Sequence, residues 1–318
     1  TAVASLGIAS AATCAPLNPA FRRAEFEAHL TRIRPIAVLT DSDGPAGLRE
    51  AAGSLNLPVW TLVERGFGPI IVDGRPLDRR VDAGRTRPDD IALLLPTSGT
   101  SSAPKMVPLT HRNVCVAARG IGATLELSGA DRCLNVMPLF HIHGLSVLYA
   151  SLATGGSVVC PPGFDSRAVV QWIRTYSPTW YSAAPSIHRM ILDEVRGHPD
   201  LAGRTGLRLV RSASAPMPRQ WIDEIESTLG IPFIEAYGMT EAGPLIASNR
   251  LPPHPRKPGS VGRAAGPEVV ILDAGGQPVA AGETGEVAIR GANVMSAYEA
   301  DPEAKAASPW ASASACRR

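Results

Sequence analysis

The run between Thr97 and Lys105 has the composition of a loop that binds phosphate groups. It combines five hydroxyl side chains, one glycine and a terminal lysine within nine positions. Hydroxyl groups and backbone amides can wrap an anionic phosphate chain, and Lys105 adds a mobile positive charge. The run is not a Walker loop, because it lacks the Gly-Lys-Ser/Thr ending. A solvated turn is the alternative, but the apolar segment 91–95 directly before it favours a phosphate-binding loop.

A second group of polar residues, 237–241, follows the short apolar run 233–235. Ligands of wound α/β folds bind at the carboxyl ends of strands, which is where this group lies. Tyr237 can pack on a purine and Thr240 can donate to a phosphate. Glu241 can hold Mg²⁺ beside phosphate oxygens, because hard cations take carboxylate and phosphate oxygens together. For Glu241 alone, a surface carboxylate is the alternative interpretation.

Two histidines, His141 and His143, form a third group, next to Phe140. On a strand, two residues separated by one position face the same side. A metal pair is one interpretation, but no third ligand accompanies them. We favour a substrate-facing role for His141, and a satisfied, hydrogen-bonded side chain is the alternative for His143.

Strand and helix patterns alternate along most of the chain, which predicts a wound α/β fold with mainly parallel sheets. The continuous apolar run 91–95 is typical of a strand buried on both faces of a parallel sheet. The expected strands are 36–40, 58–63, 91–95, 133–137, 157–160, 179–182, 207–211 and 233–235. Phe26, Leu30 and Ile33 lie at helical spacing and predict a helix that Pro35 ends, and the further expected helices are 110–123, 143–153, 166–175, 186–195 and 218–229.

The pattern changes after about residue 242, where short antiparallel strands are expected at 269–272 and 286–290. We therefore predict an incomplete α/β large domain over 1–241 and a small β-rich subdomain of it over 242–305. The Ala/Ser-rich segment 306–318 is predicted to be an irregular tail.

Composition excludes several classes of protein. The chain has 318 residues, a net charge of +2 and 5% aromatic residues, which argues against a nucleic-acid partner. Its five cysteines are far apart and form no CxxC pair, so free thiols are expected. We expect no membrane span and no signal peptide, and a cytoplasmic location, with a peroxisome the option for a eukaryotic full-length parent.

The order of these motifs resembles the adenylate-forming superfamily, which contains acyl-CoA synthetases, luciferases and nonribosomal adenylation domains. A late Gly-Glu-x-x-x-Arg-Gly segment matches here as 285–291, and Asn293 and Tyr298 continue it. The chain looks closest to the oxalate–CoA ligase and peroxisomal-type CoA synthetase branch. The segments that carry this likeness are 97–102 with Ser102, 180–188, 211–215 and 257–262.

The resemblance implies a role for each matching residue. The residues expected to grip the ATP phosphates are Thr97, Ser98, Gly99, Thr100, Ser101 and Lys105. Those expected at the adenine and α-phosphate are Ser214, Ala215, Glu235, Ala236, Tyr237, Gly238 and Thr240. Glu241 would bind Mg²⁺. Those expected around the acid are Phe140, His141, Trp180, Ser186, Ser214 and Gly243, and the implied catalytic set is Lys105, His141, Thr240 and Glu241.

The implied reaction joins a small carboxylic acid to coenzyme A at the expense of ATP, through an acyl-adenylate. A carrier-protein thiol is an alternative acceptor. The chain departs from the family pattern at Met106, where relatives have Gly, and at Pro244, which weakens oxalate as the substrate. The resemblance extends to about Lys305. Beyond it we expect the family's ribose-binding Asp, hinge and small C-terminal domain to be missing, and a frameshifted or truncated gene is our hypothesis for this. We accordingly expect weak overall ligation, with a non-catalytic nucleotide-binding remnant as the alternative.

Overall fold

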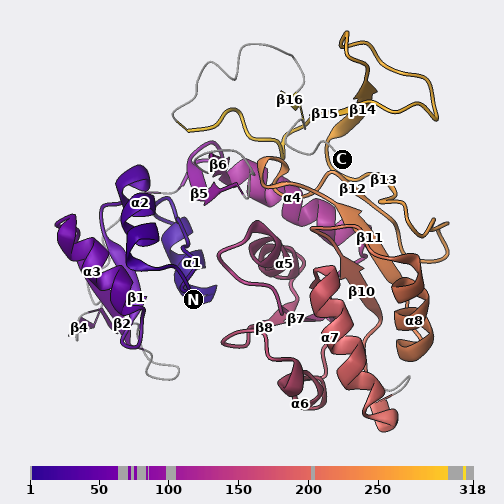
Figure 1. Cartoon of the computed structure of the whole chain (residues 1–318), viewed down its shortest axis with the longest axis horizontal. Helices are drawn as coiled ribbons and strands as arrows, with labels where there is room; N and C mark the ends of the chain where they lie inside the picture. Colours follow the sequence, from indigo (N-terminus) through magenta and orange to yellow (C-terminus); the bar gives the residue numbers. More distant parts are fainter. Residues whose placement is uncertain are drawn as a thin grey trace. The chain divides into compact units, whose positions relative to one another are not determined.

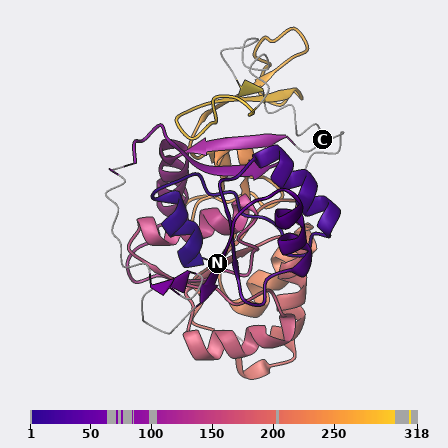
Figure 2. The same cartoon turned by 90° about the vertical axis from the view of Figure 1, so that its left-hand side faces the viewer.

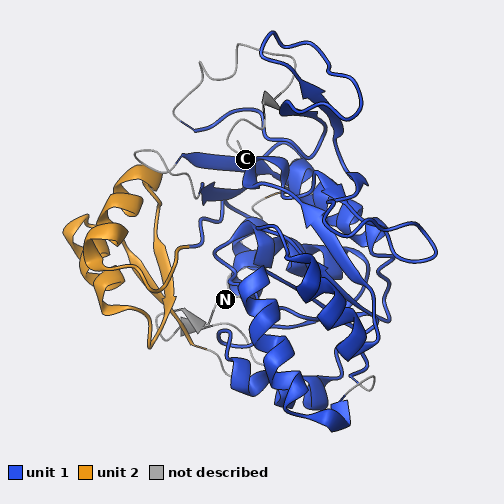
Figure 3. Cartoon of the chain, turned by 45° about the vertical axis from the view of Figure 1, so that its right-hand side comes forward, with its two compact units in different colours: residues 1–16, 86–318 blue, residues 17–85 orange. Residues whose placement is uncertain are grey.

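The computed structural model describes residues 2–63, 71–72, 75–76, 84, 86–97, 105–201, 205–299 and 311–312, with backbone only for 71–72, 75–76 and 311–312. The described chain forms two compact units (Figure 3). Unit 1 comprises residues 1–16 and 86–318, and unit 2 comprises residues 17–85. Every predicted site residue belongs to unit 1.

The elements follow the chain in the order labelled in Figure 1. The helices are α1 (Ala2–Ala9), α2 (Arg23–Ile33), α3 (Ala46–Ser54), α4 (His111–Thr124), α5 (Ile142–Ala153), α6 (Ser166–Tyr176), α7 (Pro185–Arg196) and α8 (Arg219–Leu229), with short 3-10 turns η1 (Pro199–Leu201) and η2 (Thr240–Ala242). The first strands are β1 (Val38–Asp41), β2 (Val59–Val63), β3 (Ile71–Val72), β4 (Arg75–Pro76), β5 (Ile91–Pro96), β6 (Met106–Thr110), β7 (Arg132–Leu134) and β8 (Ser157–Val159). The later strands are β9 (Trp180–Ala183), β10 (Leu209–Ser212), β11 (Phe233–Tyr237), β12 (Ala247–Ser248), β13 (Arg263–Ala264), β14 (Glu268–Leu272), β15 (Glu286–Arg290) and β16 (Ala311–Ser312).

A seven-stranded sheet in the order β13-β12-β11-β10-β9-β7-β8 is the centre of unit 1. The strands from β8 to β11 run parallel, whereas β12 and β13 add antiparallel at the edge beside β11. The wound α/β fold with a mostly parallel central sheet is therefore confirmed. All parallel strands present their carboxyl ends at one edge, where the residues following β9, β10 and β11 meet.

Successive residues of each central strand pack on opposite faces of this sheet, because side chains in a strand alternate. Cys133, Trp180, Leu209 and Ile234 share a core with α4 and α5. Their chain neighbours share a second core with α6, α7 and α8; these are Leu134, Tyr181, Val210 and Phe233. By the same alternation, Ser182 and Arg211 lie on the α5 face.

The strands β5 and β6 form a separate antiparallel hairpin. The expectation that 91–95 belongs to a parallel sheet is therefore wrong. The strand is buried all the same, since Leu93, Leu95, Val107 and Leu109 pack with Leu145 of α5 in one core. Residues 92–95 are buried at four consecutive positions, so both faces of this hairpin strand are covered and it shows the same apolar run as a strand in a parallel sheet, which explains the error.

Strands β14 and β15 pair antiparallel over Glu268↔Arg290 to Leu272↔Glu286, as the sequence predicts. Figure 2 shows this hairpin at the yellow end of unit 1. The division into compact units separates residues 17–85 and does not fall at residue 241. Strands β12 and β13 extend the central sheet beyond that residue. Within the segment predicted to be an irregular tail, the described residues 311–312 pair with β15.

Most predicted elements are present, with bounds that differ by one to three residues. Helix α1, helix α3 and strand β6 are elements that the sequence reading did not predict. Unit 2 has its own small core, in which Phe26 and Leu30 of α2 pack with Leu48 and Ala52 of α3 against Val38.

A buried ion pair organises the amino ends of the parallel strands, opposite the edge where the site residues gather. Both Asp131 oxygens accept hydrogen bonds from Arg208, at 2.6 and 2.9 Å. The same carboxylate also accepts from the Ser128 backbone and the Thr179 hydroxyl, at 2.8 Å each. Burial alone would raise the pKa of Asp131, but these hydrogen bonds outweigh it and hold the pKa below its usual value.

We expect Asp131→Asn to lower the free energy of unfolding at pH 7 by about 1–3 kcal/mol, because it removes the charged partner of Arg208. The loss stays in this range because Arg208 is partly exposed, so solvent screens its unpaired charge. A carboxyl whose pKa is depressed by folding stabilises the protein above its unfolded pKa, near 3.9, and stops doing so as pH falls through the folded value. The difference between the two proteins should therefore shrink from pH 5 to pH 2. Urea denaturation at several pH values measures it.

The matched control is Asp223→Asn, because Asp223 makes an exposed helical pair with Arg219 at 3.0 Å. Exposed pairs contribute little, so this change should cost less than about 0.5 kcal/mol. Equal losses for the two variants at pH 7, or a difference that does not vary with pH, would contradict the role of Asp131.

Candidate functional site

The β5–β6 hairpin holds the two ends of the predicted phosphate loop together. The Thr97 backbone N–H donates to the Lys105 carbonyl at 2.8 Å. The Lys105 backbone N–H donates to the Thr97 hydroxyl at 3.1 Å. Ser98, Gly99, Thr100 and Ser101 lie outside the described residues. The described ends show how the loop is anchored, and they leave the Lys105 side chain exposed.

Tyr298 connects Lys105 to Glu241, although these residues are far apart in the sequence. The Lys105 Nζ lies 4.7 Å from the centre of the Tyr298 ring. The Tyr298 hydroxyl donates to Glu241 Oε1 at 2.7 Å, and burial beside that carboxylate raises the pKa of Tyr298. The Lys105 ammonium group, the Tyr298 ring and the buried Glu241 carboxylate thus contact one another in succession beside the anchored ends of the loop.

Two asparagine amides hold the segment that carries Tyr298. Asn113 of α4 donates to the carbonyls of Ala292 and Val294, at 2.9 and 3.0 Å. Asn293 donates to the carbonyls of Ala242 and Leu245, at 2.7 Å each. The segment is therefore fixed to α4 on one side and to the turn that carries Glu241 on the other. The Met295 N–H, which donates to the Glu241 carbonyl at 2.8 Å, completes this junction.

The two predicted histidines occupy different environments. His141 directly precedes α5 and is exposed, with its ring 4.6 Å from that of Phe140. His143 lies in the first turn of α5 and is buried. The helix predicted over 143–153 is thus present as α5, and the shared face that a strand would give the two histidines is absent. Partial burial lowers the pKa of His141, which favours its neutral form.

His143 belongs to a buried polar network at the carboxyl ends of β9 and β10. Its Nε2 lies 2.7 Å from the Ser182 hydroxyl, and its Nδ1 lies 2.9 Å from the Ser214 hydroxyl. Arg211 Nη1 donates to the Ser182 hydroxyl at 3.2 Å. Burial and then the charge of Arg211 push the pKa of His143 well below its usual value, so the ring is neutral.

The neutral His143 ring joins two hydroxyl groups in this network, donating to one and accepting from the other. Arginine can only donate, so the Ser182 oxygen accepts from Arg211. That oxygen has two lone pairs and one hydrogen, so Ser182 can either donate to His143 Nε2 or accept from it, and both tautomers of the ring fit these partners. Ser214 has φ +79°, a strained conformation for a residue other than glycine.

A hollow opens beside this network. Its lining comprises Ile142, His143, Arg211, Ala213, Ser214, Gly238 and Pro244. Of the residues predicted to surround the acid, Ser214 lines it. His141 and Ser186 are exposed elsewhere at the starts of α5 and α7. Trp180 lies instead in the hydrophobic core, fully buried against Cys133 and Leu209, where a ligand cannot reach it.

Gly243 is a packing position and does not line the hollow. It has φ +61°, and a Cβ there would lie 3.2 Å from the Ala117 methyl and 3.3 Å from the Asn293 carbonyl oxygen. A larger residue would separate α4 from the segment that Asn293 holds. Gly243 therefore has a structural role in this junction, and its assignment to the acid pocket stays a prediction.

The predicted adenine segments follow β10 and β11. Ser214 and Ala215 are exposed, whereas Ala236 is buried and Tyr237 and Thr240 are half-buried. The Glu235 carboxylate accepts from the Gly259 N–H at 3.0 and 3.2 Å, and its burial raises its pKa. Gly238 passes so close to Pro244 that a Cβ would overlap its carbonyl oxygen.

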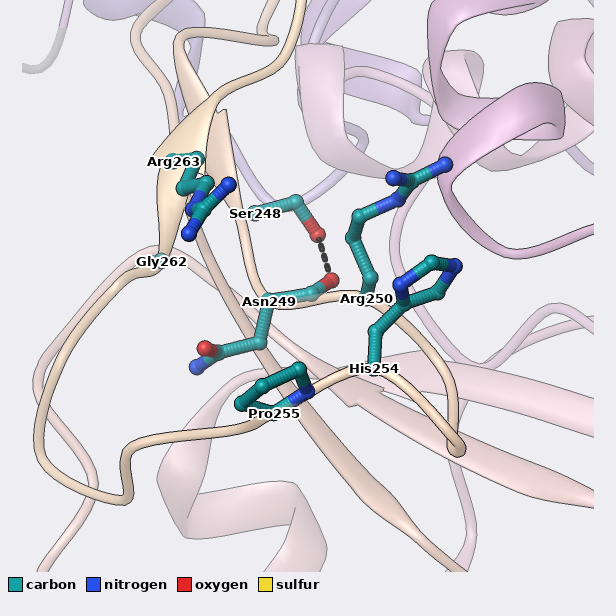
Figure 4. Close-up of a pocket in the computed structure, with 7 residues that line it drawn as sticks. All are labelled: Ser248, Asn249, Arg250, His254, Pro255, Gly262 and Arg263. Atoms are coloured by element: carbon teal, nitrogen blue, oxygen red, sulfur yellow. Dashed lines mark hydrogen bonds between the residues drawn. The ribbon is translucent and has the colours of Figure 1, made fainter.

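A second hollow lies beside β12 and β13 (Figure 4) and contains none of the predicted site residues. Its lining comprises Ser248, Asn249, Arg250, His254, Pro255, Gly262 and Arg263. Figure 4 shows the guanidinium groups of Arg250 and Arg263 on opposite sides of Ser248, so they do not converge on one point. Among the described residues, no group of three or more His, Cys, Asp or Glu could hold a metal ion.

The matched sequence family is the AMP-binding enzymes, and the match covers residues 1–299. The chain belongs to the AMP-binding enzyme family. Among its relatives, an oxalate–CoA ligase of Arabidopsis thaliana is 40% identical over 94% of this chain and 60% of the relative. A sulfoacetate–CoA ligase of Cupriavidus necator is 35% identical over 91% of this chain and 56% of the relative. The chain spans about 60% of the length of the first of these family members.

Solved structures of acyl-activating enzymes share the fold of this AMP-binding chain. The ATP-bound MatB of Rhodopseudomonas palustris superimposes with a TM-score of 0.81 and 26% identity, over 95% of this chain and 60% of MatB. A malonyl-CoA ligase with methylmalonyl-CoA and AMP bound gives a TM-score of 0.80 and 28% identity, over 96% of this chain and 63% of the ligase. The resemblance to adenylate-forming enzymes is thereby confirmed.

Two composition-based expectations also have a structural counterpart. The four cysteines among the described residues, Cys14, Cys115, Cys133 and Cys160, are free thiols. No helix in the described part of the chain has the length and apolar character needed to cross a membrane.

Sequence reasoning noted Tyr298 and Asn293 only as parts of a motif, and it gave Arg211 no role. Arg211 was visible as a charged residue that directly follows Leu209 and Val210 in the strand, and charged side chains are seldom fully buried without partners. Ser182 and Asn113 carried no such signal, since serine and asparagine are common in many settings.

Proposed function

We propose that this chain is the nucleotide-binding part of an acid–thiol ligase that forms an acyl-adenylate from ATP and a carboxylic acid. The observation that carries the proposal is the succession of Lys105, Tyr298 and Glu241 at the anchored ends of the hydroxyl-rich loop. Family membership supports it, and so do the relatives that are named as CoA ligases.

In the first step, a carboxylate oxygen of the acid attacks the α-phosphorus of ATP and pyrophosphate leaves. In the second step, a thiol sulfur attacks the acyl carbon, AMP leaves with the bonding electrons and the thiol gives up its proton. We propose coenzyme A as the thiol. The carboxylate is a weak nucleophile, so positioning and neutralisation of phosphate charge must supply most of the acceleration. Lys105 supplies mobile positive charge, and Thr240 lies beside Glu241 to donate to the phosphate.

The residues present fit a magnesium ion at Glu241. One of its oxygens accepts from Tyr298, and Glu241 Oε2 has no partner among the described residues. A buried carboxylate with one free oxygen is the ligand type that Mg²⁺ takes together with phosphate oxygens. When bound, the ion would neutralise negative charge on the phosphates. Tyr298 would orient the carboxylate, because its donated hydrogen bond leaves Oε2 as the free oxygen.

Calorimetric titration of the chain with Mg²⁺–ATP tests this function. We expect saturable binding that Lys105→Met weakens about 10- to 150-fold, because a hydrogen bond to a charged group contributes roughly 1.5–3 kcal/mol. Lys257→Met removes an exposed lysine from the loop between β12 and β13 and should leave the affinity within twofold. A folded chain that does not bind Mg²⁺–ATP, or that loses affinity equally in both variants, would sink the proposal.

A further inference from the structure

Arg211 is a buried cation whose hydrogen-bonding capacity is only partly used. The residue is 1% exposed, and its Nη2 has no hydrogen-bond partner in the described structure. Its one side-chain hydrogen bond goes from Nη1 to Ser182. Leaving a buried charged donor unpaired costs more free energy than leaving a neutral donor unpaired. An unpaired guanidinium nitrogen in this position lowers the stability of the fold. The geometry therefore points to a ligand that pairs with the guanidinium.

The place of Arg211 in the hollow identifies the kind of ligand group. Arg211 lines the hollow together with Ser214, but Ser214 is exposed at its rim whereas Arg211 is buried at its base. Ser214 and Gly238, two of the residues predicted to contact the nucleotide, line the same hollow, and Ser214 does so at its exposed rim. An acid entering the hollow therefore places its reacting carboxylate at the rim and its other end at Arg211.

The chemistry of the reaction favours the same orientation of the acid, with its reacting carboxylate away from Arg211. A carboxylate paired with a guanidinium is less basic and thus a weaker nucleophile, so Arg211 is poorly suited to hold the reacting group. A fork of N–H donors suits a second carboxylate or a sulfonate.

We infer that this site takes a short acid with a second anionic group, and that Arg211 binds this second group and determines the specificity for it. The inference rests on the proposed function, because it concerns the acid of that same reaction. Ser182 and His143 act as positioning residues: they hold Nη1 in place, which leaves Nη2 directed to the ligand.

The test measures acid binding with the nucleotide site filled by Mg²⁺ and α,β-methylene-ATP, which cannot release pyrophosphate. Malonate and succinate are titrated beside acetate and butyrate, into the wild-type chain and Arg211→Met. We expect the wild type to bind the diacids at least about tenfold more tightly than the monoacids. Arg211→Met should lose that preference, while its affinity for the monoacids stays within about threefold. Arg263→Met, which removes an exposed arginine of the second hollow, should match the wild type.

Two outcomes would overturn the inference. An equal loss for diacids and monoacids would place the reacting carboxylate at Arg211, and no loss for either would show that the guanidinium does not touch the acid. Diacid binding that depends on Arg211 in a chain that cannot bind the nucleotide would keep the inference and sink the proposed function.

Folding of the variant is checked separately. Replacing an unpaired buried charge by an apolar side chain is often neutral or stabilising, so Arg211→Met should unfold at the wild-type temperature or above it. If that variant does not fold, side-chain nitrogen NMR of wild-type Arg211 answers the same question. Malonate should shift its Nη signals and acetate should not; equal shifts or none would count against the inference.

Discussion

The Glu241→Gln variant is expected to bind Mg²⁺–ATP about 10- to 100-fold more weakly than the wild type, the range found when the support of a metal site is removed. The amide keeps the shape of the side chain and can still accept the hydrogen bond from Tyr298. What it removes is the negative charge beside the free oxygen. Calorimetry with and without Mg²⁺ measures the effect.

The sign of the effect should reverse without the metal. In EDTA, the Glu241 carboxylate repels the phosphates, so the glutamine variant should bind ATP as tightly as the wild type or more tightly. Tyr298→Phe should show a smaller loss in Mg²⁺, because it retains the ring below Lys105 and frees the carboxylate to turn. An equal loss of affinity in the presence and absence of Mg²⁺ would show that Glu241 does not hold the metal.

The second large effect is expected at Gly238, where the first residue after β11 touches the Pro244 backbone. A methyl group there would overlap the Pro244 carbonyl. That carbonyl cannot retreat, since Leu245 and Ile246 are fully buried and Asn293 holds the Leu245 carbonyl. Overpacking typically costs about 1–3 kcal/mol, and a clash with fixed backbone belongs at or above the upper end. In a chain of 318 residues, about 3 kcal/mol lowers the unfolding temperature by roughly 4–5 °C.

The comparison variant is Gly163→Ala, because a Cβ at Gly163 meets nothing within 4 Å and its φ is not positive. It should change stability by less than about 0.5 kcal/mol. Gly238→Ala should also weaken Mg²⁺–ATP binding at a temperature where it remains folded, since the displaced segment leads to Thr240 and Glu241. If Gly238→Ala unfolds at the same temperature as the wild type, the turn can accommodate the methyl group without strain and the prediction is contradicted.

The elements that could be predicted from sequence are those whose buried face produces a regular spacing of apolar residues along the chain. Helix α8 is an example, because Ile222, Ile225 and Leu229 share one face and are buried. Strand β15 was predicted at its observed bounds for a similar reason. The pairing of β5 escaped prediction, because an apolar run reports burial and not the direction of the neighbouring strand.

The candidate site was predictable in part, because its motifs are local. The runs around Lys105 and Glu241 carry their chemistry in adjacent residues. Their link through Tyr298 joins three separate segments, and no local pattern reports such a contact. Trp180 was assigned to the acid pocket by resemblance, whereas strand alternation directs its side chain to the core beneath α4 and α5. The importance of Arg211 in the hollow follows from its buried Nη2, which has no hydrogen-bond partner among the described residues. A sequence does not report whether a side-chain nitrogen has a partner.

The amide groups of Asn113 and Asn293 have a consequence for how this protein can vary. Both donate to backbone carbonyls, so neither needs a particular side chain at the positions they hold. The exposed turn 273–276 of the β14–β15 hairpin makes none of these contacts, so it can gain or lose residues while Tyr298 still returns to Glu241. That hairpin is a place where a domain could be inserted, or a binding tag displayed, without disturbing the nucleotide site.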